Sequence, residues 1–284
     1  MTMASVCCSE SAPRPAEAPL RGAEGRLVQE MLRVMKRPEA VVEEVAVGGK
    51  FVAVVASGRL GLASLLGARP GAGESGLPAD AVGKTAAEVA GLLRSSSPFA
   101  ICVGMAALNA ADTWDAQAPS PSAPPADALI ATLGKGRSVG VVGDFPFIER
   151  LRTEVGDLHL FELRDVAGAV ARRNWESVLA EVDVLAVTAT ALLTRQMAYF
   201  LSHASHADTV VLGPTTPPSQ VLFEFGADFL CGCVVTDMQR ILEGVRAGLS
   251  FRALKKGGGL RFFQWGRNDP TPGAPGAARP CLRS

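Results

Sequence analysis

Short apolar runs alternate with helix-capable segments along the second half of the chain. The runs are nearly continuous, which is typical of strands buried on both faces of a parallel sheet, and they lie at 138–142, 157–162, 183–188, 209–213 and 228–231. The segments after them predict helices at 146–154, 174–181, 191–204, 217–226 and 237–248. Strands that alternate with helices at this spacing indicate βαβ units. We therefore expect a doubly wound, Rossmann-like α/β domain of about five parallel strands over residues 129–266.

The first half of the chain has a different pattern. It opens with apolar residues at helical spacing, followed by β-branched runs broken at Gly48-Gly49, which predict two or three antiparallel strands joined by tight turns. Apolar patterns at 81–94 and 99–112 predict two further helices, the second buried on most sides. The order of these elements predicts an α+β domain over residues 23–115.

Three stretches have little capacity to form a core. Residues 1–22 are rich in Ala, Pro and Ser, and residues 267–284 carry several Pro and Gly with little apolar material. Both are predicted to be disordered tails, because they cannot bury enough surface to offset the entropy of ordering. Residues 116–128, AQAPSPSAPPADA, are proline-rich and predict a linker between the two domains, with a long surface loop as the alternative.

Charge and composition narrow the class of protein. The 284 residues include 28 Lys plus Arg and 28 Asp plus Glu, so the balance gives no electrostatic case for nucleic acid or an anionic membrane surface as a partner. No apolar stretch is long enough for a membrane span, and the N-terminal residues lack the pattern of a signal peptide. Six cysteines are too few for a dense disulfide framework. We therefore expect a cytoplasmic protein with reduced thiols.

The turn after the first parallel strand carries an incomplete glycine motif. Gly140 and Gly143 form G-x-x-G, and Phe145 with Pro146 adds bulk where a pyrophosphate would need space. Asp144 is placed to cap the following helix, and its carboxylate would compete with a phosphate for the same donors. The motif therefore disfavours classical NAD binding.

Other strand ends carry polar residues that should meet at one edge of the sheet, where ligands bind to such folds. Glu162 follows the second strand at the distance of a ribose-binding acid, or is an ordinary carboxylate paired with Arg164. Small residues and hydroxyls, which allow close approach of a polar ligand, follow the third and fourth strands at Thr188, Thr190, Gly213, Pro214 and Thr215.

Soft-metal ligands are present only in incomplete sets. Cys231 and Cys233 would follow the fifth strand and face the same side, so two thiolates could bind a metal, but buried cysteines more often fill apolar space. His203 and His206 could share a helix face, although exposed histidines are common at helix ends. No hydrolase or kinase motif occurs.

Several segments together resemble one known family. VGDFPFIERL, DVLAVTATALLT, VVLGPTTPPS, FLCGCVVTD and the earlier GMAALNA are similar, in order and spacing, to the signatures of a two-domain family to which heavy-metal chelation is attributed. The resemblance implies an N-terminal domain like that of enolase, a Rossmann-like C-terminal domain, and a ligand-binding cleft between them. By this resemblance, the residues of the cleft are Asn109, Gly143, Phe145, Pro146, Glu162, Thr188, Thr190, Gly213, Pro214 and Thr215. Asp237 is a further candidate for the cleft, and Asp144 is a further candidate donor to a metal.

This chain departs from the family pattern after the third strand. The family reads T-G-T-T-L-x-N-G-T, whereas residues 188–196 read TATALLTRQ. Ala189 and Arg195 thus stand where the pattern has glycine, and the ligand is expected to differ from that of typical members.

Three hypotheses on function stay open. The first is binding of a heavy metal, or of a metal-containing small molecule, at the interdomain cleft, with Glu162, Cys231 and Cys233 as weak metal candidates. The second is an enzyme acting on a small anionic substrate or a nucleotide in the same cleft. The third is a non-catalytic partner protein with the fold of an enzyme. The identity of a transition-metal cofactor and the formation of a homo-oligomer are left open by the sequence.

Overall fold

The computed structural model describes residues 20, 22–114, 124–164 and 166–271. Most of the two predicted tails and of the predicted linker lies outside these residues. The last part of the predicted linker is helical, because residues 126–128 form the first turn of helix α5 (Ala126–Leu133). The prediction of a linker is wrong for these three residues. Within the described ranges, none of the helices is long and apolar enough to cross a membrane.

The N-terminal half is built on a three-stranded antiparallel sheet, as the sequence predicts. Its strands β1 (Val42–Val47), β2 (Phe51–Ala56) and β3 (Arg59–Ser64) lie in the order β1-β2-β3. Helix α4 (Pro98–Asp112) packs against β2 and β3, and nearly all of its residues are buried. Gly61 permits this close approach, because a Cβ at that position would lie 2.2 Å from the Ala106 carbonyl oxygen. The predicted helix at 99–112 is therefore confirmed.

The other helices of this half are α1 (Gly22–Arg33), α2 (Leu77–Ala81), α3 (Ala86–Ala90) and the 3₁₀ turn η2 (Gly91–Arg94). The single helix predicted over 81–94 is wrong, because Val82 is extended and a new helix begins after Thr85. Thr85 and Glu88 form a reciprocal capping box at that start.

The C-terminal half contains a six-stranded sheet in the order β5-β4-β6-β7-β8-β9. All neighbouring strands are parallel except β8 and β9, which run antiparallel. The sequence predicts the first five strands but not β9, and the strands are β4 (Val139–Val142), β5 (Leu158–Phe161), β6 (Val184–Thr188), β7 (Asp208–Leu212), β8 (Phe229–Val235) and β9 (Leu260–Gly266).

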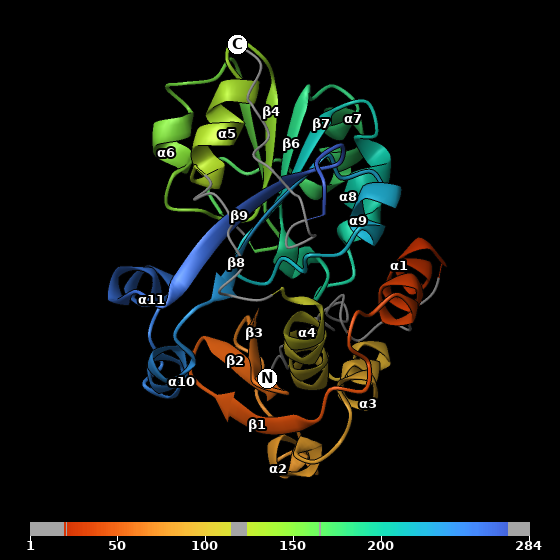
Figure 1. Cartoon of the computed structure of the whole chain (residues 1–284). Helices are drawn as coiled ribbons and strands as arrows, with labels where there is room; N and C mark the ends of the chain where they lie inside the picture. Colours follow the sequence, from red (N-terminus) through yellow and green to blue (C-terminus); the bar gives the residue numbers. More distant parts are fainter. Residues whose placement is uncertain (1–19, 21, 115–123, 165, 272–284) are drawn as a thin grey trace, which may run out of the picture.

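Helices cover both faces of this sheet, which confirms the doubly wound α/β architecture (Figure 1). One face packs against α5 and α6 (Ile148–Leu151). The other face packs against α7 (Trp175–Leu179), α8 (Met197–His203) and α9 (Val221–Glu224). Several of these helices span only one or two turns, so turns, 3₁₀ segments and irregular chain occupy the rest of the predicted helical ranges.

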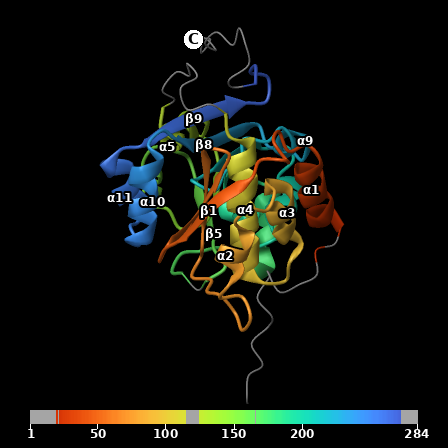
Figure 2. The same cartoon turned by 60° about the horizontal axis from the view of Figure 1, so that its bottom comes forward.

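Two helices that follow β8 in the sequence pack against the antiparallel sheet of the N-terminal half. Helices α10 (Met238–Arg246) and α11 (Phe251–Gly257) connect β8 to β9, and α10 lies on the face of the three-stranded sheet opposite α4 (Figure 2). The contact is close, because a Cβ on Gly48 would lie 1.8 Å from the Val245 carbonyl oxygen. Arg246 also pairs with Glu44 on β1. The antiparallel sheet is thus sandwiched between one helix of each half.

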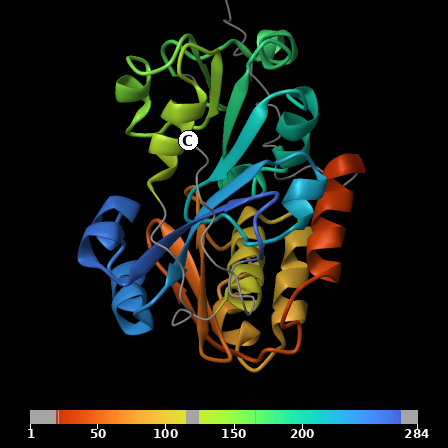
Figure 3. The same cartoon turned by 45° about the horizontal axis from the view of Figure 1, so that its top comes forward.

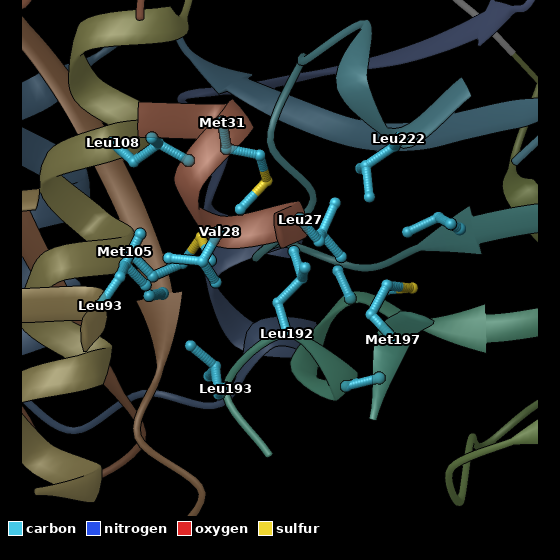
Figure 4. Packing of buried hydrophobic residues seen from close by; sticks show 14 of the residues in the cluster. Leu27, Val28, Met31, Leu93, Met105, Leu108, Leu192, Leu193, Met197 and Leu222 are labelled. Atoms are coloured by element: carbon cyan, nitrogen blue, oxygen red, sulfur yellow. The ribbon is translucent and has the colours of Figure 1, made fainter. Parts of the chain in front are cut away.

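Helix α1 joins the halves from another side (Figure 3). Its buried residues Leu27, Val28 and Met31 pack between α4 and the segment that leads into α8 (Figure 4). The Glu24 carboxylate accepts a hydrogen bond from the Tyr199 amide, 3.2 Å away, in the first turn of α8. A side chain of α1 therefore caps a helix of the other half.

We expect Glu24→Gln to stabilise the protein near pH 8 and to have little effect near pH 5. Burial raises the pKa of Glu24 to about 7, although hydrogen bonds from the Tyr199 and Ala198 amides and the charge of Arg195 oppose the shift. When folding raises the pKa of a carboxyl, its contribution to the free energy of unfolding is fully present below the pKa of the unfolded chain. That contribution is lost as the pH rises through the pKa of the folded state. Glutamine escapes that loss because it cannot ionise. Urea unfolding at both pH values measures the difference.

The matched control is Glu30→Gln on the same helix, where the carboxylate pairs with the exposed Arg33. It should change the free energy of unfolding by less than about 1 kcal/mol at either pH. An equal effect of Glu24→Gln at both pH values would contradict the assignment.

Candidate functional site

The strand order places a topological switch point between β4 and β6. The chain leaves β4 for β5 on one side and later passes to β6 on the other side, and ligands of such sheets bind beyond the carboxyl ends at that point. Gly143 follows β4 with φ of 102°, and a Cβ there would lie 3.1 Å from Thr188 Cγ2 at the end of β6. A side chain at 143 would therefore be strained and would crowd Thr188.

Two carboxylates lie beside this point and share one guanidinium. Arg164 lies 3.7 Å from Asp144 Oδ2 and 3.2 Å from Glu162 Oε2. Glu162 Oε1 also accepts bonds from the Leu163 amide at 2.9 Å and the Arg164 amide at 3.2 Å. The structure therefore shows the pairing with Arg164 that the sequence left as one alternative for Glu162. The additional bridge to Asp144 could not be read from the sequence.

The charge state of Glu162 follows from these contacts. Burial alone would raise its pKa, but hydrogen bonds from Arg164 and Leu163 and the positive charge of Arg164 outweigh it, so the pKa lies below the usual value. Glu162 is 12% exposed, whereas Asp144 is 52% and Arg164 71% exposed. The three groups thus form a charged cluster with one inner and two outer members.

The predicted role of Asp144 as a helix cap is wrong. Helix α6 begins at Ile148, its N-cap position is Phe147, and no side chain bonds to its first amides. Pro146 lies in the turn before that helix and not in its first turn. Phe145 stacks on Phe147 with ring centroids 5.0 Å apart, so aromatic rings occupy this turn.

Two hydroxyls complete this region. Thr188 Oγ1 and Thr190 Oγ1 are 2.9 Å apart, and both residues are partly exposed at the end of β6. Thr188 also caps the 3₁₀ turn η4 (Ala189–Ala191) by accepting a bond from the Thr190 amide. We call Gly143, Asp144, Phe145, Glu162, Arg164, Thr188 and Thr190 the switch-point cluster.

The two positions where the family pattern has glycine differ in the cost of the replacement. Ala189 lies in the 3₁₀ turn, where the missing glycine matters little. Arg195 has φ of 55°, a left-handed conformation that costs a non-glycine residue roughly 1–2 kcal/mol. The second glycine of the pattern is therefore the one whose replacement strains the backbone.

Four other predicted residues, Asn109, Gly213, Pro214 and Thr215, form a second group, where β3 and α4 meet the loop after β7. The Asn109 side-chain amide donates to the Leu62 carbonyl at 2.8 Å and to the Thr215 carbonyl at 3.1 Å. The Thr215 hydroxyl accepts from the Ser64 amide at 3.1 Å. We call Leu62, Ser64, Asn109 and Thr215 the junction cluster, because its bonds link β3 and α4 to the loop after β7.

The junction leaves little space for a ligand. Between β3, α4, the loop 213–219 and β8 lies a void of about 10 Å³, which is roughly the room that one water molecule needs. Asn109 Oδ1 is buried and has no hydrogen-bond partner among the described residues. Pro214 lines the void, and Gly213 turns the chain into this loop with φ of 116°. In this conformation the hydrogen bonds of the junction cluster hold the two halves together.

The cysteines lie elsewhere than predicted. Strand β8 extends to Val235, so Cys231 and Cys233 lie inside it, paired with Gln264 and Phe262 of β9, and do not follow the strand. Burial raises the pKa of each of these thiols to about 12. Both thiols are thus protonated in this structure, and a metal bound to them would have to displace their protons.

Asp237 has a local structural role. It is the N-cap of α10, where its Oδ1 accepts from the Arg240 amide at 3.1 Å and its Oδ2 lies 3.2 Å from Arg240 Nε. The structure therefore does not join Asp237 by hydrogen bonds to either cluster.

Over the described ranges, no group of three or more His, Cys, Asp or Glu side chains lies close enough to hold a metal ion. His203 Nδ1 lies 2.8 Å from the Tyr199 carbonyl and its Nε2 lies 3.9 Å from Glu176. His206 lies in the turn after α8, outside the helix that would have aligned it with His203.

Two family models match the chain, and both carry the description "putative heavy-metal chelation". DUF4213 matches residues 28–111, and DUF364 matches residues 127–264. The fold and these matches define a two-domain protein, with the DUF4213 domain before the DUF364 domain. The chain therefore carries these two domains, as the sequence segments indicate, and their function is not established.

Solved structures show the same fold. A DUF364-family protein of unknown function from Desulfitobacterium hafniense DCB-2 is 24% identical, with a TM-score of 0.72 over 86% of this chain and 98% of that one. A second, from Pyrococcus horikoshii, is 17% identical, with a TM-score of 0.66 over 86% of this chain and all of that one. The search of curated proteins gave no match.

We expect Asn109→Ala to destabilise the protein by about 2–3 kcal/mol. The substitution leaves the Leu62 and Thr215 carbonyls without their donor, and an unsatisfied buried polar group costs about 1–3 kcal/mol. Urea unfolding measures the loss. Thr132→Ala is the control, since its exposed hydroxyl bonds only within α5, and it should have little effect. A change below about 0.5 kcal/mol for Asn109→Ala would contradict a fastening role.

Proposed function

We propose that the chain binds a metal-containing small molecule, a metal ion held by an anionic organic chelator, at the switch-point cluster. The observation that carries the proposal is the pair of carboxylates, Asp144 and Glu162, that share Arg164 at the ends of β4 and β5, with the Thr188 and Thr190 hydroxyls at the end of the adjacent strand β6. This is the edge of the sheet where doubly wound folds bind ligands. The family description supports a metal as part of the ligand.

The chemistry of the donors favours a chelated metal over a bare ion. Structural zinc sites use four protein ligands and catalytic ones three, but the cluster supplies only two carboxylates. A chelator would bring most of the donors itself and leave one or two positions on the metal for Asp144 or Glu162. Arg164 could then pair with a carboxylate of the chelator, because its fork of N–H groups matches that geometry.

The hydroxyls would add orientation. Thr188 and Thr190 each combine a donor with acceptor lone pairs, so they can bond to oxygen or nitrogen atoms of the organic part. Gly143 allows the backbone after β4 to pass close to Thr188 without a side chain between them. The cluster thus offers negative, positive and neutral polar groups within one edge of the sheet.

A second candidate function rests on Arg164 itself. Its guanidinium is 71% exposed and could bind a small anionic substrate or a nucleotide phosphate without any metal. Thermal unfolding with nucleotides and with citrate alone tests this alternative, since a ligand at a hundredfold excess over its dissociation constant stabilises by about 2.7 kcal/mol.

We expect cobalt(II) citrate to bind more tightly than cobalt(II) alone or citrate alone. Asp144→Asn and Glu162→Gln should each weaken binding of the complex by about tenfold or more, because a hydrogen bond or metal contact of a charged group contributes about 1.5–3 kcal/mol. Isothermal titration calorimetry with the three probes measures the affinities.

Glu149→Gln is the matched control, because it removes one negative charge from a side chain that is 88% exposed on α6. It should leave the affinity unchanged. Equal affinity of the wild type and both cluster variants for cobalt citrate would overturn the proposal. Binding of citrate alone with the same affinity would favour the second candidate.

A further inference from the structure

The loop between β6 and α8 ends in a strained residue. Among the described residues only Ser57, Leu66 and Arg195 have positive φ without being glycine. Ser57 and Leu66 lie in the turns that follow β2 and β3, and Leu66 is exposed. Arg195 instead lies at a position that connects both halves of the molecule, and such strain persists where the surrounding contacts determine the conformation.

The side chain of Arg195 reaches the N-terminal half. Its guanidinium donates to the Ser95 carbonyl, in the segment between η2 and α4. It also lies within electrostatic reach of Glu24 on α1, whose carboxylate accepts from the Tyr199 amide. Two separate segments of the N-terminal half therefore contact the end of this loop and the start of α8.

The middle of the loop is held by apolar packing. Leu192 and Leu193 are each 3% exposed. They lie among side chains of α1, α4 and η2, with Val28 and Leu93 among the neighbours (Figure 4). The second part of the loop between β6 and α8 is thus held by contacts with the N-terminal half.

We propose that Arg195 is a positioning residue for the switch-point cluster. Its bond to the Ser95 carbonyl fixes the loop 189–196 in the conformation that keeps Thr190 beside Thr188, which is itself held in β6, so the N-terminal half determines ligand affinity without touching the ligand. The inference rests on the proposed function, because it assigns the hydroxyls to ligand binding. It predicts that loop order and affinity fall together when the donor is removed.

The test compares two variants of similar length. Arg195→Met removes the donor, whereas Arg195→Lys keeps a cationic donor that can reach the same carbonyl. Hydrogen exchange followed by mass spectrometry reports opening of residues 189–196, and calorimetry with cobalt(II) citrate reports affinity. We expect Arg195→Met to speed exchange in the loop and to weaken binding, each by about tenfold, and Arg195→Lys to restore most of both.

A second pair separates strain from positioning. Arg195→Gly and Leu66→Gly both relieve a left-handed conformation, but only the first removes a contact between the halves. Leu66→Gly should leave loop exchange and affinity unchanged, and Arg195→Gly should behave like Arg195→Met. Unchanged loop exchange in Arg195→Met and Arg195→Gly would overturn the proposal, as would faster exchange with unchanged affinity. Absence of cobalt citrate binding in the wild type would sink the proposed function alone, because the exchange measurement still decides whether Arg195 holds the loop.

Discussion

The two sheets share one apolar core, and the position of every candidate binding residue depends on this packing. Helix α4 is buried on nearly all sides because β2 and β3 cover one part of it and α3 and η2 cover another. Helix α1 fills the space between α4 and the segment that leads into α8 (Figure 4). Helix α10 supplies the opposite layer of the N-terminal sheet. Since each half covers apolar surface of the other, we expect the halves to unfold together and their relative placement to be narrowly defined.

This packing explains why the two polar clusters differ. The junction cluster lies inside the shared core, where its amide and hydroxyl groups bond to backbone groups of both halves and leave room for about one water molecule. The switch-point cluster lies at the outer part of the same edge, where Asp144 and Arg164 remain exposed. Buried polar groups that satisfy one another determine structure, whereas exposed groups of mixed charge can exchange partners for a ligand. We therefore propose that the switch-point cluster binds the ligand and that the junction cluster holds the two halves together.

The sequence predicts those parts of the fold that depend on local pattern. Continuous apolar runs identified the five parallel strands, but β9 was missed because Arg261 and Gln264 interrupt its apolar residues and three glycines precede it. The contact between Gly143 and Thr188 follows from the strand order and could be expected, and Glu162 could be paired with Arg164 from adjacency alone. The bonds of Asn109 could not, since its partners lie 47 and 106 residues away. Family spacing therefore grouped residues that the structure divides between two clusters.

The location of the bound metal tests this account most directly. A crystal of the protein soaked with cobalt(II) citrate would show the metal by its anomalous scattering at the cobalt absorption edge. The account predicts a peak beyond the carboxyl ends of β4 and β6, beside the Asp144 and Glu162 carboxylates. A peak in the void between Asn109 and Cys233 would contradict it, because the junction would then be the binding site and its fastening role secondary.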